Sequence, residues 1–480
     1  MPELPGHGSI RLQSTGNFDK RLPLPAKPLT QSAFRPTIRR RMSTNVSAGG
    51  DQQPLTGYRL KCLASGQTLP DSRSTILLGN SSTRDAALLR TAYFQRQLNP
   101  RHTSYGLYRF SDWLPLCREL EGSSAPITYR SRALAQQLGL SRLYVTFSGY
   151  WPERGASMLT GTFKECEAFS VCGRIPPDFP ATLVVASAGN TARAFIHVCS
   201  QNRIPVIVVV PERNLDAIWS PFAVHDSVTV IAAADHADYA QAIELAATIA
   251  ALDDYVGEGG ARNVARRDGM GTTVLSAVTT IGSIPDYYFQ AVGSGTGAIA
   301  AWEAHQRLVT DGRFGTNPMR LMLSQNAPFL LLYNSWKARS RALLSLDEAT
   351  EKAQIEQIYA TVLSNRTPPW AVKGGLYDAL EATDGEMYAV DNREAQAAAE
   401  LFEKSEGIDI APAAAVALAS LIEAVDRNDI ARDATIMLNV TGGGVRRFRS
   451  EHPTQQVIPR FVVPRSQTSK EYIAALLRKR

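Results

Sequence analysis

Three short segments of the chain place reactive or anion-binding groups beside small, flexible residues. Lys164 ends the segment Thr-Gly-Thr-Phe-Lys, and a desolvated lysine amine can act as both a nucleophile and a base. A lysine by itself is most often a solvated surface residue, so its meaning depends on its neighbours. Two turns further along, at residues 187–191 and 293–297, supply groups that can bind anions.

The turn at 293–297 reads Gly-Ser-Gly-Thr-Gly and lies between an apolar strand-like run, 287–292, and a helical pattern, 298–308. Glycines let several backbone N–H groups converge on one anion, and the start of a helix adds a favourable dipole. The hydroxyls of Ser294 and Thr296 can also donate to phosphate oxygens. The segment predicts a phosphate-binding cup, with a plain tight turn as the alternative.

The turn at 187–191 reads Ser-Ala-Gly-Asn-Thr, follows a strand-like run at 182–186 and opens a helical pattern at 192–200. Its small residues leave backbone N–H groups exposed, and these could bind a carboxylate. Asn190 can both donate and accept hydrogen bonds. The alternative is an ordinary turn that caps the helix.

A nicotinamide-dinucleotide site is the rival interpretation of residues 293–297. Such a site needs an acidic residue at the end of the next strand, where it holds a ribose. The next strand-like run, 321–323, is followed by Ser324 and Gln325. The lack of a carboxylate there disfavours a nicotinamide-dependent oxidoreductase.

The elements that must position these segments alternate between apolar strands and helices. Further strands are expected at 205–210, 228–232 and 435–440, and a long Ala-rich helix at 237–251. Continuous apolar strands separated by helices favour a parallel α/β sheet covered on both faces. In such sheets, ligands bind at the carboxyl ends of the strands.

The lysine segment, the two turns and a later segment, Asn-Val-Thr-Gly-Gly-Gly at 439–444, occur in the order used by a known family. In this order they resemble the fold-type II pyridoxal-phosphate enzymes, the group of tryptophan synthase β and threonine synthase. The resemblance covers the chain from about residue 58 to about residue 460. It implies an α/β fold in which two domains hold the cofactor in the cleft between them.

Within that group, the chain is most similar to the cysteate synthases. The likeness rests on the segments at 149–153, 163–168 and 373–380. Threonine synthases usually carry Asp-Arg directly after the lysine, where this chain has Glu165 and Cys166.

The resemblance implies roles for individual residues around pyridoxal 5′-phosphate. Lys164 would form the Schiff base, Asn190 would hydrogen-bond the 3′ oxygen of the ring, and Thr441 would meet the pyridine nitrogen. The cofactor phosphate would be bound by Gly293, Ser294, Gly295, Thr296 and Gly297. The substrate α-carboxylate would be bound by Ser187, Ala188, Gly189, Asn190 and Thr191.

The implied activity is a β-replacement on an amino acid, in which O-phospho-L-serine and sulfite give L-cysteate and phosphate. The partners are then a small amino-acid substrate and an anionic or thiol nucleophile. Because phosphate and sulfite are anions, the site needs cations, for which Arg193, Lys373 and Arg154 are candidates. Two alternatives stay open: a threonine synthase-like β,γ-replacement on O-phosphohomoserine, and a non-catalytic pseudoenzyme of the same fold.

The chain of 480 residues is long for one core, which favours more than one domain. A large cofactor-binding domain is expected at 51–175 and 276–480, with a small inserted domain at 176–275 that carries the carboxylate turn. Closure of the small domain on substrate would expel water from the site. The resemblance also implies a homodimer, an assembly common in the family.

Composition excludes several other classes of protein. Charged residues make up 20% of the chain and the net charge of +6 is modest, so nucleic-acid binding is not required to explain it. No apolar run approaches the roughly 18–20 residues that a membrane span needs. The five cysteines are scattered without a CxxC pair, which favours a reducing compartment. Cys62 is followed by Ser65 where relatives can carry a second cysteine, so no structural zinc is expected.

Residues 1–50 are rich in Pro, Ser, Thr and Gly and show little hydrophobic periodicity. An arginine cluster precedes Met42, as in a mitochondrial transit peptide, but several prolines would break an amphipathic helix. A disordered tail or an upstream start is favoured over targeting. The expected location is therefore the cytoplasm, with the mitochondrion as the alternative.

Overall fold

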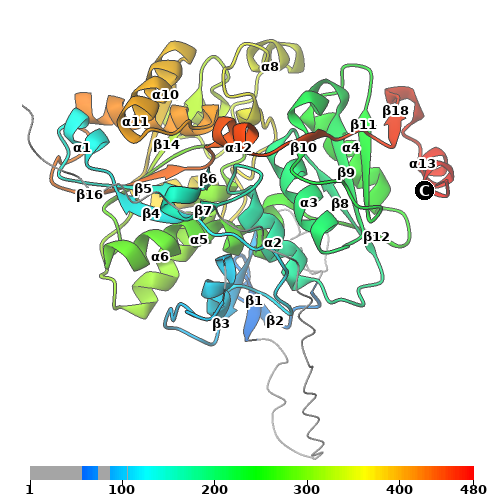
Figure 1. Ribbon diagram of the computed structural model, residues 1–480, viewed down its shortest axis with the longest axis horizontal. Coiled ribbons are helices and arrows are strands. Elements are labelled where there is room, and N and C mark those ends of the chain that lie inside the picture. Colours follow the sequence, from blue (N-terminus) through cyan, green and yellow to red (C-terminus); the bar gives the residue numbers. More distant parts are fainter. Residues whose placement is uncertain (1–56, 74–86, 105, 480) are drawn as a thin grey trace, which may run out of the picture. The chain divides into compact units, whose positions relative to one another are not determined.

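The computed structural model describes residues 57–73, 87–104 and 106–479 (Figure 1). The expected leader at residues 1–50 lies outside these ranges. Within them, strands and helices alternate along the chain, which confirms the α/β class. No helix in the same ranges is long and apolar enough to cross a membrane.

The larger sheet carries most of the strands that end near the candidate site. Its spatial order is β15 (Glu386–Val390), β14 (Arg320–Asn326), β13 (Tyr287–Ala291), β16 (Thr435–Val440), β5 (Arg142–Phe147) and β4 (Ile127–Arg130). Neighbouring strands run parallel except for β4, which is antiparallel to β5. Parallel strands bring their carboxyl ends to one edge, so the turns that follow β13 and β16 are neighbours.

Helices cover both faces of the larger sheet (Figure 1). On one face, α11 (Pro412–Asp426) packs on β13, β14 and β16, and α10 (Asn392–Glu406) packs on α11. On the other face, α5 (Val264–Ile281) and α6 (Thr296–Asp311) contact the sheet and each other. The largely apolar strands between them form the main core, as double coverage requires.

A second parallel sheet has the order β12 (Tyr255–Gly257), β8 (Thr182–Ala186), β9 (Val206–Pro211), β11 (Val228–Ala233) and β18 (Phe461–Val463). Alternate side chains of β9 point to opposite faces. Val206, Val208 and Val210 enter the core with α3 (Asn190–Gln201), whereas Ile207 and Val209 enter the core with α4 (Tyr239–Ala250). This explains why the strand reads as a continuous apolar run in the sequence.

The second sheet includes a strand from the far end of the chain. Val462 of β18 pairs in parallel with Ala232 of β11. Helix α13 (Lys470–Leu477) then packs against α4 through Ile473 and Leu477. The expected domain boundaries at 175/176 and 275/276 stay a prediction, and this pairing adds residues 461–463 to the sheet that 182–257 builds.

The strand expected at 321–323 is longer in the structure. It runs over Arg320–Asn326, so Ser324 and Gln325 lie inside β14 and are buried. Gln325 Oε1 accepts hydrogen bonds from the backbone N–H groups of Leu332, at 2.7 Å, and Tyr333, at 2.9 Å. Partners from other segments therefore bind Gln325 Oε1 and Ser324 Oγ, which donates to the carbonyl of Val416 at 3.4 Å, whereas Gln325 Nε2 has no hydrogen-bond partner among the described residues.

The other elements lie around the two parallel sheets. A small antiparallel sheet has the order β2 (Thr68–Leu69), β1 (Tyr58–Cys62) and β3 (Leu89–Tyr93). Short antiparallel pairs join β6 (Tyr150–Trp151) to β7 (Ala156–Ser157) and β10 (Trp219–Ser220) to β17 (Gln455–Gln456). Further helices are α1 (Ala133–Leu138), α2 (Lys164–Arg174), α7 (Leu331–Lys337), α8 (Glu348–Ile355), α9 (Leu376–Ala382) and α12 (Val445–Glu451).

Among the described residues, no cluster of three or more His, Cys, Asp or Glu could hold a metal ion.

A buried ion pair joins α5 to α6 behind the site. Arg267 donates from Nε to Glu303 Oε2 at 3.0 Å, and both side chains are almost fully buried. Burial alone would raise the pKa of Glu303, but the neighbouring guanidiniums, Arg267 first, outweigh burial and lower it. The Glu303 carboxylate is therefore charged at neutral pH and balances the positive charge of the buried Arg267.

We expect Glu303→Gln to lower the free energy of unfolding by about 3–5 kcal/mol, because it leaves Arg267 without a counter-charge. The stability that the carboxylate contributes is present above its unfolded pKa of about 4.3 and is lost as pH falls through the lower, folded pKa. Urea unfolding of both proteins between pH 7 and pH 3 tests this. The difference should shrink at low pH, and Glu348→Gln, at an exposed pair with Lys352, should leave the unfolding midpoint unchanged. An equal, pH-independent loss in both variants would contradict it.

Candidate active site

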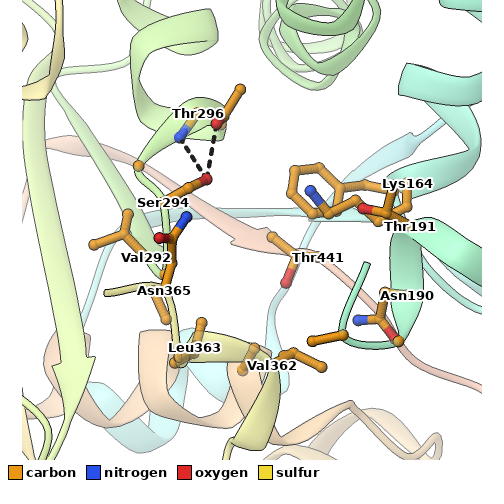
Figure 2. Close-up of a pocket in the computed structure, with 18 of the residues that line it drawn as sticks. Lys164, Asn190, Thr191, Val292, Ser294, Thr296, Val362, Leu363, Asn365 and Thr441 are labelled. Atoms are coloured by element: carbon orange, nitrogen blue, oxygen red, sulfur yellow. Dashed lines mark hydrogen bonds between the residues drawn. The ribbon is translucent and has the colours of Figure 1, made fainter. Parts of the chain in front are cut away.

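The sequence-predicted segments meet in one pocket at the carboxyl ends of β8, β13 and β16 (Figure 2). Lys164, the turn at 187–191, the turn at 293–297 and Thr441 all line it. Each turn directly follows its strand, so the two sheets deliver their loops to a common cavity. Segments that are far apart in the sequence are thereby brought within reach of one small molecule.

Lys164 is the first residue of α2, and the turn before it is fixed by a buried carboxylate. Glu165 Oε1 accepts from the backbone N–H of Thr160 at 2.6 Å and from its hydroxyl at 2.7 Å. Glu165 Oε2 accepts from Ser124 Oγ at 2.7 Å. Glu165 thus holds the backbone turn from which the lysine projects, and it does not line the pocket.

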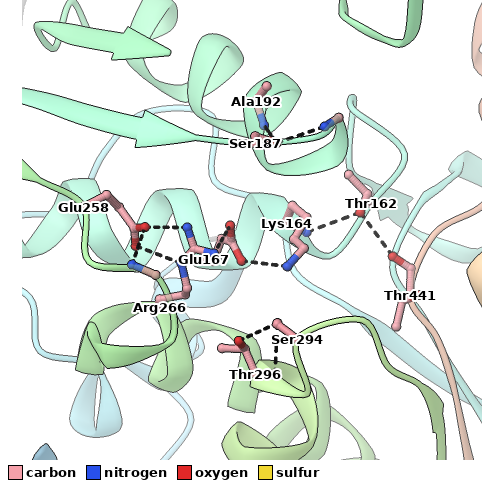
Figure 3. A network of polar contacts seen from close by, with 12 residues as sticks. Thr162, Lys164, Glu167, Ser187, Ala192, Glu258, Arg266, Ser294, Thr296 and Thr441 are labelled. Carbon is pink, nitrogen blue, oxygen red and sulfur yellow. Dashed lines mark hydrogen bonds and ion pairs between the residues drawn. The ribbon is translucent and has the colours of Figure 1, made fainter. Parts of the chain in front are cut away.

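The amine of Lys164 begins a chain of buried charges (Figure 3). Its Nζ donates to Glu167 Oε2 at 3.0 Å, and Glu167 Oε1 lies 3.4 Å from Nη1 of Arg266. Arg266 also donates from Nε to Glu258 Oε1 at 2.8 Å. Glu167 was not singled out in the sequence, although it lies one helical turn after Lys164, where side chains share a face.

Burial and pairing set the charge states along this chain. Burial alone would raise the pKa of Glu167, but Arg266 and Lys164 outweigh burial and hold it below its usual value. Burial would lower the pKa of Arg266, but Glu167 and Glu258 reverse this and raise it. Burial raises the pKa of Glu258, and Arg266 opposes that rise. The Lys164 amine therefore faces a carboxylate that stays charged at neutral pH.

Ser187 organises the turn at 187–191. Its hydroxyl accepts from the backbone N–H groups of Gly189, at 3.0 Å, and Ala192, at 2.9 Å. Within the described part of the chain, the N–H groups of Ala188, Asn190 and Thr191 donate to no protein group. These free donors at the start of α3 can bind a carboxylate.

The turn at 293–297 leaves a second set of free donors. Across the described ranges, the N–H groups of Gly293, Ser294, Gly295 and Gly297 have no acceptor in the protein. The hydroxyls of Ser294 and Thr296 lie 2.7 Å apart and face the pocket (Figure 2). Gly295 has φ of +75°, and a Cβ there would lie 2.5 Å from Leu376 Cδ2, so the turn requires glycine at this position.

Thr441 ties the end of β16 to the lysine segment. Its backbone carbonyl accepts from the N–H of Phe163 at 3.0 Å and from the hydroxyl of Thr162 at 3.3 Å. Its own side chain lines the pocket. The residue before Lys164 and the proposed partner of the ring nitrogen are therefore held in register by backbone hydrogen bonds.

The candidate cations lie elsewhere. Arg193 does not line the pocket; its guanidinium is 5.0 Å from the centre of the Trp219 ring. Arg154 lies with its guanidinium 4.0 Å from the Tyr129 ring centre, also outside the pocket. Lys373 is exposed and lines a separate surface depression. A substrate-binding role for these residues stays a prediction, and the geometry gives no direct contact with the pocket.

Other lining residues were not found from the sequence. These are Phe163, Tyr239, Arg266, Met270, Gln290, Ala291, Val292, Val362, Leu363, Asn365 and Ala413. Arg266 left one signal, because it begins a run of charged residues, Arg266 to Asp268, in a helix that has no other charged residue. The loop at 362–365 shows no periodicity, and only the tertiary fold brings it to the site.

The groups present fit pyridoxal phosphate. The pocket offers a primary amine, a glycine turn whose free N–H groups and hydroxyls suit a phosphate, and the Asn190 amide. A second set of free N–H groups suits an amino-acid carboxylate. Amine, phosphate cup and carboxylate turn on an α/β scaffold define a fold-type II cofactor enzyme.

Comparison with known proteins agrees. Residues 128–442 match the family model of the pyridoxal-phosphate dependent enzymes, so the chain belongs to that family and uses this cofactor. It is 48% identical over 403 residues to the cysteate synthase of Methanosarcina barkeri, covering 84% of this chain and 95% of the relative. It is 47% identical over 407 residues to that of Methanosarcina acetivorans, covering 85% and 96%. The sequence-based expectation of a cysteate synthase-like, pyridoxal-phosphate dependent enzyme is confirmed.

A solved structure also shares the fold. Maize serine racemase superposes with a TM-score of 0.51 over 68% of this chain and 92% of its own, at 14% identity. At that identity the likeness shows the fold alone. It supports the fold-type II architecture expected from the order of the motifs.

Proposed function

We propose that this enzyme replaces the phosphate of O-phospho-L-serine by sulfite, giving L-cysteate and phosphate. The observation that carries the proposal is the shared pocket of the Lys164 amine, the free donors of 187–191 and the glycine turn at 293–297. Similarity to curated cysteate synthases over most of the chain favours this substrate pair.

Each group of the pocket has a task in such a reaction. When bound, pyridoxal phosphate supplies an electron sink for charge at the α carbon of the substrate. The turn at 187–191 holds the substrate carboxylate, which orients the α C–H bond toward Lys164. The Lys164 amine takes the α proton and later returns it. Glu167, 3.0 Å away, orients that amine between the two transfers.

The ring nitrogen of the cofactor and the anionic reactants also need partners in the pocket. The Thr441 hydroxyl would contact the ring nitrogen of the cofactor without protonating it, and the cofactor would then supply a weaker electron sink that suits elimination and replacement. The positive side chains that line the pocket, among the described residues, are Lys164 and Arg266. Because Arg266 is already paired with two carboxylates, backbone N–H groups must supply much of the binding of the leaving phosphate.

The test is product analysis with purified, cofactor-loaded enzyme. O-phosphoserine and O-phosphohomoserine are each incubated with sulfite, sulfide, a thiol or buffer alone, and products are read by mass spectrometry and phosphate release. We expect cysteate and stoichiometric phosphate from O-phosphoserine with sulfite, and none with Lys164→Ala. Threonine from O-phosphohomoserine, or cysteine as the preferred product, would overturn the substrate assignment. No turnover of any pair by soluble loaded enzyme would favour the pseudoenzyme.

The assembly and the compartment remain predictions. We propose a homodimer, which light scattering of the purified protein tests directly, and a cytoplasmic rather than mitochondrial location. The leader that bears on the location lies outside the described residues.

A further inference from the structure

Arg193 is a half-buried cation beside the active site, yet its guanidinium is turned away from the pocket. It lies on α3, three residues after Asn190, and stacks 5.0 Å from the centre of the Trp219 ring. Arg449 approaches the same ring at 5.2 Å. Among the described residues, no carboxylate forms an ion pair with Arg193. Glu165 is close enough to raise the pKa of Arg193 but forms no ion pair with it, so the contacts that the guanidinium does make call for a role.

Burial and the nearby Arg449 lower the pKa of Arg193 to about 10, so the side chain remains protonated at neutral pH. The cost of burying it is offset by aromatic stacking and by hydrogen bonds to neutral acceptors. Nη1 donates to the backbone carbonyl of Ala217 at 3.3 Å. The two terminal nitrogens of the guanidinium are therefore caged by protein acceptors, while Nε has no hydrogen-bond partner among the described residues.

The other terminal nitrogen, Nη2, contacts both the lysine segment and the turn at 187–191. Nη2 donates to Asn190 Oδ1 at 2.9 Å and to the backbone carbonyl of Thr160 at 3.2 Å. Thr160 begins the segment that ends in Lys164, and Asn190 belongs to the carboxylate turn. A single guanidinium thus links the segment that carries Lys164 to the turn at 187–191.

The bond to Asn190 also decides which way its amide faces. A guanidinium can only donate, so the atom of Asn190 that it contacts must be the carbonyl oxygen. The amide nitrogen is then left facing the pocket as a donor (Figure 2). Without Arg193, either end of the amide could face the pocket, and one of them would oppose an oxygen of the cofactor ring.

We propose that Arg193 is a positioning residue, which fixes the Asn190 amide with its N–H toward the ring oxygen of the cofactor. This replaces the direct contact with substrate expected from the sequence. The inference rests on the proposed role of Asn190 at the ring oxygen. Arg193 acts through Asn190, so its removal should change the cofactor's surroundings before it changes substrate binding.

The experiment measures the dissociation constant for pyridoxal phosphate and the wavelength and pH dependence of the bound cofactor's visible absorption. The proteins are wild type, Asn190→Ala, Arg193→Leu, Arg193→Lys and the double variant Asn190→Ala/Arg193→Leu. We expect Asn190→Ala and Arg193→Leu each to weaken cofactor binding about tenfold and to shift the absorption in the same direction. Arg193→Lys, which keeps a donor, should lie between wild type and Arg193→Leu.

The double variant decides between a positioning role and general destabilisation. If Arg193 acts through Asn190, Arg193→Leu adds no further change once Asn190 is alanine. Additive effects, or a wild-type spectrum in Arg193→Leu, would overturn the inference while leaving Asn190 in its role. A wild-type spectrum in Asn190→Ala would instead overturn the proposed role of Asn190. Thermal unfolding verifies that each variant folds, and Arg213→Leu, at a more exposed arginine in the segment 212–217, serves as the matched control.

Discussion

Replacing Lys164 by alanine should reduce turnover by at least about a thousandfold, because the pocket then lacks the amine that moves the α proton. Lys164 is the one lysine that lines the pocket among the described residues. The second expected result is chemical: borohydride reduction of wild-type holoenzyme should attach the cofactor to the peptide that carries Lys164. Peptide mass spectrometry reads this directly and does not depend on the identity of the substrate.

Lys404→Ala is the matched control, since Lys404 is an exposed lysine on α10. It should keep full activity and full labelling of Lys164. Labelling of a different lysine in wild-type enzyme, or undiminished turnover by Lys164→Ala, would contradict the assignment of the catalytic amine. Added methylamine offers a further check, because a small amine that enters the empty space can restore part of the proton transfer.

Gly269→Ala should strongly destabilise the protein and displace the lysine. Helices α2 and α5 cross so closely that a Cβ on Gly269 would lie 2.2 Å from the backbone oxygen of Cys166 and 2.7 Å from Ser170 Cβ. No side-chain rotation relieves a clash with backbone, so α2 must move, and Lys164 is its first residue. We expect a loss of about 3 kcal/mol in unfolding free energy and weaker cofactor binding.

Gly271→Ala on the same helix is the control. Its nearest neighbour would be the carbonyl of Ala300 at 3.3 Å, a milder contact, and alanine is the better helix former by about 1 kcal/mol. The change should therefore be near neutral in urea unfolding. If Gly269→Ala were as well tolerated as Gly271→Ala, the close crossing would not be what sets the place of α2.

Many of the strands could be predicted from the sequence because they are buried on both faces of their sheets. The strands at 182–186 and 435–440 occur where expected, since continuous apolar runs between turns have few alternatives. The predicted strand, 321–323, is shorter than the observed one, because Ser324 and Gln325 look like a strand end until their tertiary partners are known. The pairing of β18 with β11 has no local signal, since parallel partners can be distant in sequence.

The site shows the same division. Lys164 and the two turns were found because glycine and small residues mark places where backbone N–H groups are exposed. Arg193 was predicted to bind substrate, and that role stays a prediction; the orientation of its side chain could not be known from the sequence, because stacking on Trp219 is a contact between distant segments. Glu167 and Arg266 were missed because buried carboxylates and guanidiniums look like surface charges in a sequence until their burial and pairing are seen.

By itself, the sequence determined the α/β class and the cofactor family, and it predicted residues that meet in one pocket. These depend on local patterns: apolar periodicity, glycine turns and a lysine in a fixed order. Only the tertiary structure decided how charge is arranged around that lysine. The chain Lys164–Glu167–Arg266–Glu258 and the caging of Arg193 arise from packing of separate elements, and burial is what makes those charges interact strongly.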